Sequence, residues 1–374
     1  MSDPTSQSEP NKSTTPGNTE TGSPDNKAEL NGALKNLAET GNEQHKRDQA
    51  FEKYAGYGPQ YQKANAERAA SAKIKVDEFG PVTIIASINV DPQTGTTIDG
   101  HDYNPEAQSH KDIEQAWQKY LLETPEAERF VVFEGDSESF TDRDTAIRLR
   151  TEAGMMMFFA DELGVDRVSG EPTDLLVADE LEKAGIAREE TALLFTLRSL
   201  ATHESDKPIG DMKYDFYPHL ESVGFEGFPV YSEEEKKVFA QLVDGEFTDQ
   251  SHEAVTKRAE INQEIFEKVS PFVEAWNKSL NEYGLPQLVV TESQEIVFED
   301  PKSRGDVAKS ANPAAEGIHS KRMAATTEIR DRHILDTIAD ATRAGKKPFV
   351  VYGGSHVVSL EPVLAEYYGN VQSS

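Results

Sequence analysis

Three apolar runs constrain the fold of this chain more than any other feature of its sequence. Residues 82–88, 130–133 and 348–352 are rich in β-branched and aromatic side chains and show no regular alternation with polar residues. Strands of this kind are buried on both faces, as in a parallel sheet that helices cover on each side. The runs therefore predict interior strands of such a sheet.

Helical patterns separate these strands. The clearest helix spans 142–164, where Thr141 or Asp142 is a suitable N-cap and Gly164 suits the position after the last turn. The other predicted elements are a helix at 109–123, a strand at 167–170, a helix capped by Thr173, a helix at 320–344 and a helix at 357–368. Alternating strands and helices predict an α/β fold, with a largely parallel sheet flanked by helices.

Composition divides the chain into five parts. After Met1 the first part has no large apolar side chain, so it is expected to be disordered, because it cannot bury enough surface to offset its ordering entropy. The fourth part is helix-rich, with a long amphipathic stretch at 253–283, and is expected to lie over the strand ends as a lid. The parts are a polar, acidic tail (1–28), a helical lead-in (29–78), the first part of the α/β domain (79–186), a mostly helical insertion (187–317) and the C-terminal part of the α/β domain (318–374).

Charge and composition exclude several classes of protein. The 374 residues include 67 acids against 38 bases, a formal charge of -29, which argues against nucleic-acid partners and anionic membrane surfaces. There is no cysteine, so disulfide scaffolds, cysteine-ligated zinc and thiol nucleophiles are excluded. The first residues lack the features of a signal peptide, and no apolar run is long enough to cross a bilayer. A cytoplasmic protein without a membrane partner is expected.

Polar residues follow the predicted strands at the end where open parallel sheets bind ligands. Three of the four strand ends carry a carboxylate or an imidazole beside a glycine, which lets a backbone approach a ligand closely. The candidates are Ser87 and Asn89 after the first strand, Glu134 and Asp136 after the second, Glu171 after the third, and Gly353, Gly354, Ser355 and His356 after the last.

Each candidate also has a structural interpretation. Glu134 could form a structural ion pair, Asp136 could be a turn residue, and Glu171 could be an ordinary loop acid. Glu152, in an otherwise apolar helix, is either a satisfied buried acid or part of the site. A neutral imidazole at His356 could ligate a metal or act as a base near neutral pH.

Arg330 and Asp331 form a further charged pair on the helix before the last strand. Adjacent helical residues point about 100° apart, so at most one of the two is expected to face the site. Arg330 could clamp a carboxylate or an oxyanion through its planar guanidinium, or it could lie on a solvated face. No Walker loop, Gly-x-Gly-x-x-Gly turn or Gly-x-Ser-x-Gly elbow is present, which removes the main support for kinase, dehydrogenase and ordinary α/β-hydrolase functions.

Together these segments resemble the TraB/PrgY–Tiki family, within the wider ChaN-like and erythromycin-esterase-like superfamily. The sequence FVVFEGD at 130–136 resembles the family's glutamate strand, Arg330-Asp331 its Arg-Asp helix, and Gly353 to His356 its second Gly-x-x-His. The first Gly-x-x-His is replaced by the sequence ASIN at 86–89. The resemblance covers roughly 80–180 and 320–370 and leaves the insertion unmatched.

The resemblance implies a hydrolase that acts on a peptide or on a small ester or amide. His356 would be the general base or a metal ligand, Glu134 would orient water or bind the metal, and Glu171 would support them. Arg330 would stabilise the oxyanion, and Asn89 would donate a hydrogen bond to it.

The resemblance leaves the need for a metal open. His356, Glu134 and Asn89 would form the metal site, and a set so rich in oxygen favours Mn, Mg or Ca over softer ions. The cofactor expected is a divalent ion such as Mn, Mg or Co. The erythromycin-esterase branch implies a site without metal, in which one histidine suffices.

Two other functions are compatible with the sequence. The missing first histidine would suit a protein that has lost catalysis and binds a small ligand, such as haem in the ChaN-like branch, in the same cleft. The second is an interaction protein that uses 253–283 as its docking surface. Packing of this amphipathic stretch on the sheet explains its apolar residues more simply.

Overall fold

The computed structural model describes residues 44–47, 49, 74–87, 104–202, 211–225, 238, 242, 251–299 and 317–369. The chain divides into two compact units, 1–49 and 50–374. In the first unit the described residues are helical. The second unit contains every element discussed below.

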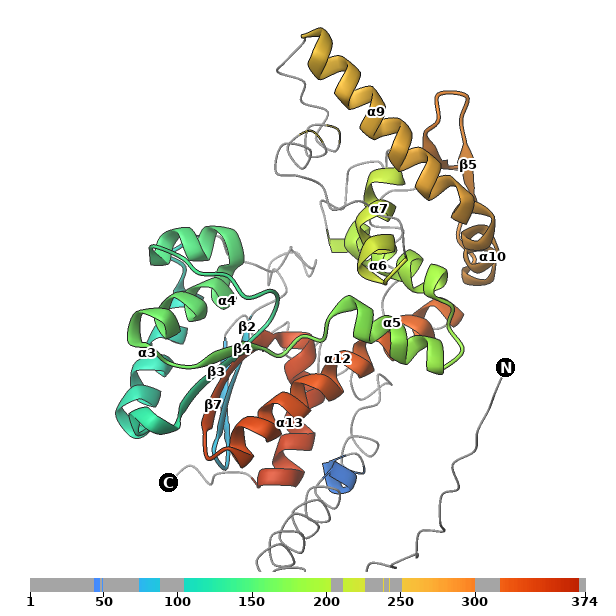
Figure 1. Cartoon of the computed structure of the whole chain (residues 1–374). Helices are drawn as coiled ribbons and strands as arrows, with labels where there is room; N and C mark the ends of the chain where they lie inside the picture. The colour runs from blue at the N-terminus through green and yellow to red at the C-terminus, as the bar shows by residue number, and fades with distance from the viewer. Residues whose placement is uncertain are drawn as a thin grey trace, which may run out of the picture. The chain divides into compact units, whose positions relative to one another are not determined.

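A five-stranded sheet forms the centre of the α/β part (Figure 1). Its strands follow the order β1-β2-β7-β3-β4, in which β1 and β2 pair antiparallel and all other neighbours pair parallel. The fold is therefore mixed α/β with a mostly parallel sheet, as the apolar runs predict. The strands are Lys75–Phe79 (β1), Val82–Ser87 (β2), Arg129–Phe133 (β3), Arg167–Ser169 (β4) and Lys347–Gly353 (β7).

Helices cover both faces of the sheet, which explains why its central strands are apolar throughout. On one face Ile84, Val132 and Val350 pack against α12 (Ile318–Arg343) and α13 (Gly354–Tyr368). On the other face Ile85, Val131 and Val351 pack against α3 (Gln108–Glu123) and α4 (Arg143–Leu163). Alternate residues of one strand thus enter different cores, so both faces of the central strands favour apolar side chains.

Helix α4 begins and ends where the sequence predicts, but it is kinked. The Asp142 side chain caps its first turn, and Gly164, in the left-handed conformation, ends it. Thr151 interrupts the helix with φ 53° and ψ -134°, a conformation that side chains other than glycine rarely adopt. Gly154 fits one turn later, where a β-carbon would lie 2.2 Å from the carbonyl oxygen of Ala146.

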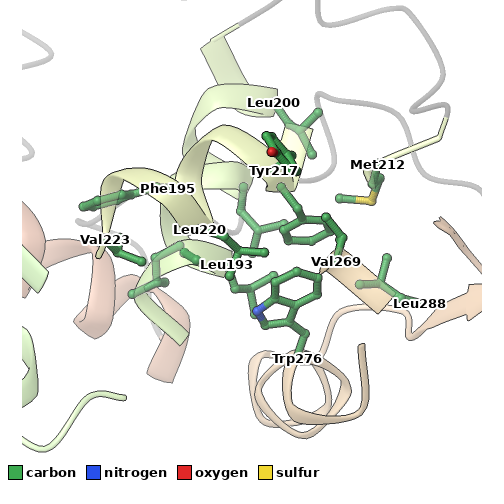
Figure 2. Packing of buried hydrophobic residues seen from close by; sticks show 14 of the residues in the cluster. Leu193, Phe195, Leu200, Met212, Tyr217, Leu220, Val223, Val269, Trp276 and Leu288 are labelled. Atoms are coloured by element: carbon green, nitrogen blue, oxygen red, sulfur yellow. The ribbon is translucent and has the colours of Figure 1, made fainter. Parts of the chain in front are cut away.

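A second, mainly helical core is formed by residues from α5 (Asp174–Lys183) to the start of α12. Figure 2 shows its buried side chains around Trp276, which stacks on Phe216 with 3.8 Å between ring centroids. Its elements are α6 (Arg188–Thr202), α7 (Lys213–Ser222), α9 (His252–Val269), the 3-10 turn η2 (Ser270–Phe272), α10 (Val273–Tyr283) and the hairpin of β5 (Leu288–Val290) with β6 (Ile296–Phe298).

Two sequence expectations need correction. The last residues of the predicted helical lead-in, 75–78, belong to the edge strand β1, so the sheet begins earlier than the apolar run at 82–88 indicates. The amphipathic stretch 253–283 is two helices, because Pro271 cannot continue the hydrogen-bond ladder and a 3-10 turn separates α9 from α10. Among the described residues, no helix is long and apolar enough to cross a membrane.

Candidate active site

The carboxyl ends of three strands bring predicted site residues together. Glu134 follows β3, Glu171 follows β4, and His356 lies in the first turn of α13, after β7. These strands are parallel neighbours, so their ends meet at one edge of the sheet. One ligand atom from each residue lies within 4.8 Å of the ligand atoms of the other two. We call Glu134, Glu171 and His356 the Glu–Glu–His group.

Asp331 of α12 orients the imidazole of His356. The Nδ1 atom of His356 lies 2.5 Å from Oδ1 of Asp331, whose side chain is fully buried. Ser359 donates a hydrogen bond to the other carboxylate oxygen. A carboxylate at Nδ1 keeps the proton on that nitrogen and leaves Nε2 as the basic atom that faces the site.

Burial and charge act in opposite directions on His356. Burial has the largest single effect and disfavours the charged imidazolium, but the charge and hydrogen bond of Asp331 together with the charge of Glu134 outweigh it. The pKa of His356 is therefore raised above its ordinary value of 6.5, although Arg330 opposes the change.

Glu134 stands across a gap from the imidazole. Its Oε2 accepts a hydrogen bond of 2.7 Å from the backbone N–H of Gly353, which fixes the carboxylate. Its Oε1 lies 4.0 Å from His356 Nε2 and 3.8 Å from Arg330 Nη2. A separation of 4.0 Å is too long for a direct hydrogen bond, and one bridging oxygen atom can close it.

Glu171 and Arg330 form a nearly buried ion pair. Arg330 donates from Nε and Nη2 to the two oxygens of Glu171, at 2.6 and 2.7 Å. Burial alone would raise the pKa of Glu171, but the charges of Arg330 and His356 lower it below its ordinary value. Glu171 is thus an anion near neutral pH, and two of the five N–H donors of Arg330 are committed to it.

The Glu–Glu–His group fits a divalent cation. It offers one imidazole nitrogen and two carboxylates, a donor set used for Mn, Co and Zn. Asp331 behind the imidazole matches the carboxylates that orient metal-bound histidines. Arg330 competes with an ion for Glu171, since both need its oxygens.

The other predicted residues do not join this group. Asp136 has a side chain that is 91% exposed and lies 3.9 Å from Arg150, so it belongs to the surface. Gly353 and Gly354 contribute the backbone at the turn from β7 to α13. Asn89, and the side chains of Ser87 and Ser355, lie outside the described residues.

A cavity of about 240 Å³ adjoins the site on the α4 side. Glu134 and Gly353 line it together with the kinked turn of α4 at Thr151 and Glu152. Glu152 is buried and lines this cavity, but it is not one of the Glu–Glu–His group. The kink therefore opens space beside the carboxylate that faces His356.

The sequence does not predict the positions of three residues near the site. Asp331 is buried against His356 while Arg330 binds Glu171, so the expectation that only one of the pair faces the site is wrong. Arg198 of α6 lies close enough for the charge of Arg330, together with burial, to lower its pKa to about 10. Tyr352 lies in the apolar strand β7 and therefore looks like a core residue. The one sign that it is near the site is its place close to the end of that strand, beside the strand that Glu134 follows.

Comparison with protein-family models, with curated proteins and with solved structures finds no match for this chain. The resemblance to the TraB–Tiki family thus remains a prediction from its short motifs.

Proposed function

We propose that this protein is a hydrolase of the TraB–Tiki type that adds water to the carbonyl group of a peptide or of a small ester or amide. One arrangement supports the proposal: Asp331 binds Nδ1 of His356, and the free Nε2 faces Glu134 Oε1 across 4.0 Å. A water molecule in that gap would donate its hydrogens to Nε2 and to Oε1.

In this mechanism His356 removes the proton as the water oxygen attacks the carbonyl carbon, and Asp331 stabilises the imidazolium that forms. Glu134 holds the water by its second hydrogen. His356 then returns the proton to the leaving oxygen or nitrogen, so the base is regenerated.

A divalent cation would be held by His356, Glu134 and Glu171. Such an ion lowers the pKa of a bound water and polarises a carbonyl oxygen. Asp331 holds the imidazole of His356 and the backbone N–H of Gly353 holds the carboxylate of Glu134, whereas Glu171 would have to release Arg330 in part to reach the ion. We further propose that the helical part at 187–317 covers the strand ends, in keeping with the effect of Arg330 on Arg198 of α6.

The hydrolase proposal is tested by turnover of p-nitrophenyl acetate and of a fluorogenic peptide library. We expect His356→Ala and Glu134→Gln each to lower kcat/KM by about 10²-fold or more, the usual effect of losing a general base or its partner. His252→Ala, at an exposed histidine that begins α9, is the control and should keep full activity. Equal rates in all four proteins would contradict a hydrolytic role and favour the small-ligand function, which a haem titration then examines.

The metal is tested separately by thermal unfolding with EDTA, Mn, Mg, Co or Zn. A ligand that binds only the native state raises the midpoint by mass action. A rise that is specific to one ion and lost in His356→Ala would establish the site, whereas no rise with any ion would leave the metal-free mechanism.

A further inference from the structure

The hydroxyl group of Tyr352 is a buried donor for which the described residues supply no hydrogen-bond partner. The side chain is 1% exposed, and among the described residues no group accepts from or donates to its Oη. A buried hydroxyl without a partner costs about 1–3 kcal/mol, and phenylalanine would fill the same space without that cost. A tyrosine here is therefore unfavourable for stability alone.

This hydroxyl lies at the same strand ends as the Glu–Glu–His group. Val351 pairs with Phe133, so the next residues along the two strands, Tyr352 and Glu134, are level with each other. The phenol extends to the end of β4, where a β-carbon on Gly170 would lie 2.3 Å from Oη. Gly170 precedes Glu171, and the phenol ring meets the imidazole of His356 edge to face, 5.8 Å between centroids.

The proposed reaction requires hydrogen-bond donors at the carbonyl oxygen of the substrate. When water adds to a carbonyl, its oxygen becomes negatively charged and needs donors. The Nε and one Nη2 hydrogen of Arg330 already bind Glu171, while Glu134 and Glu171 can only accept. Burial and the nearby Glu171 and Glu134 charges raise the pKa of Tyr352, so its hydroxyl remains protonated and can donate.

Resting on the proposed hydrolase function, we infer that Tyr352 is a catalytic residue whose hydroxyl donates a hydrogen bond to the carbonyl oxygen of the substrate as that oxygen gains negative charge. Gly170 is small because the phenol needs its space to reach this position. The substrate oxygen supplies the acceptor that the hydroxyl does not find among the described residues.

Tyr352→Phe tests the inference with p-nitrophenyl acetate as substrate. We expect kcat to fall by about 10²–10³-fold, as on loss of an oxyanion donor, while the thermal midpoint stays the same or rises. Tyr120→Phe is the matched control, because the Tyr120 hydroxyl donates to Lys347 O at 2.7 Å and accepts from Phe130 N at 2.9 Å at the opposite ends of the strands. That variant should lose stability and keep its activity.

The outcomes separate this inference from the proposed function. Full activity in Tyr352→Phe, with activity lost in His356→Ala, would overturn the role of Tyr352 and leave the hydrolase intact. A clear fall in the midpoint of Tyr352→Phe would show a structural role for the hydroxyl and also overturn it. Activity retained in both variants would remove the hydrolase function and the inference together. As a readout without turnover, methylphosphonate, a tetrahedral oxyanion, should bind Tyr352→Phe at least several-fold more weakly by calorimetry.

Discussion

Asp331 determines how His356 ionises. Because Asp331 raises the pKa of His356, the neutral base forms only as pH rises through that elevated value. We expect kcat/KM to rise with pH through an inflection above 6.5. In Asp331→Asn the inflection should move to lower pH, and the plateau should fall by about 10²–10⁴-fold because the amide favours the wrong tautomer. Ser359→Ala, which removes only one hydrogen bond to Asp331, should give a smaller change. A pH–rate profile identical to the wild type would contradict this role.

His319 predicts a pH dependence of stability. It is 3% exposed, stacks on Tyr283 at 4.6 Å, and burial lowers its pKa from 6.5 to about 4. Between these values the unfolded chain binds a proton that the folded chain excludes, so the free energy of unfolding falls as pH drops from about 6.5 to 4. The loss is on the order of 3 kcal/mol. His319→Phe should flatten the curve in this window in urea titrations, and an unchanged slope would show that other groups cause it.

The convergence of three candidate residues could be predicted, because strand ends determine their positions. Glu134, Glu171 and His356 follow apolar strands directly, and the rule for open parallel sheets places them together. The helical angle between Arg330 and Asp331 predicts that at most one of the two faces the site, so it gives no reason to expect a role for both. They have different targets: Arg330 reaches the end of β4, and Asp331 reaches α13. Sequence spacing does not contain that information.

The kink of α4 leaves no room for a side chain at Gly154. A β-carbon there would lie 2.2 Å from a backbone oxygen, so the backbone itself must shift. We expect Gly154→Ala to lower the free energy of unfolding by about 2 kcal/mol or more. Gly164→Ala is the control on the same helix: its site is open, and the left-handed conformation alone costs about 1 kcal/mol. Equal losses in denaturant unfolding would show that the kinked turn is loosely packed.

Elements with strong caps or continuous apolar runs were predictable, and short or broken ones were not. The strand β1 escaped because its sequence, KVDEF, is mostly charged, which an edge strand with one solvated side tolerates. The kink at Thr151 does not alter the apolar pattern, because only this one residue departs from the helical conformation. Local propensity therefore gave the boundaries of α4 and missed its shape.

At the scale of the whole molecule, the helical core is expected to contribute to stability as strongly as the sheet. Trp276 is fully buried, stacks on Phe216, and donates to Glu189 O at 2.7 Å. Trp276→Ala should cost about 3–5 kcal/mol in denaturant unfolding. Val289→Ala, at an exposed position of β5 outside this core, should cost well under 1 kcal/mol. A comparable loss in both variants would contradict a cooperative core around Trp276.

The overall class of the fold could be derived from the sequence. Strands that helices cover on both faces are apolar throughout, and this lack of polar alternation is visible in the sequence. The arrangement of the helical part could not. Its helices are amphipathic, and which apolar stripes meet depends on side-chain packing between segments as distant as 193 and 276. The hydrophobic pattern of a helix shows which of its faces is buried, but it does not show which other helix packs against that face.

The position of β7 has a consequence for the order in which the protein is made. This strand lies between β2 and β3, yet the ribosome synthesises it long after both. In a nascent chain that lacks β7, the edges of β2 and β3 that pair with it are unpaired. Unpaired strand edges promote aggregation. Arg330, Asp331, Tyr352 and His356 emerge in the same late stretch. Vectorial synthesis therefore completes the sheet and the Glu–Glu–His group in one late event, and no partly made chain carries the whole group.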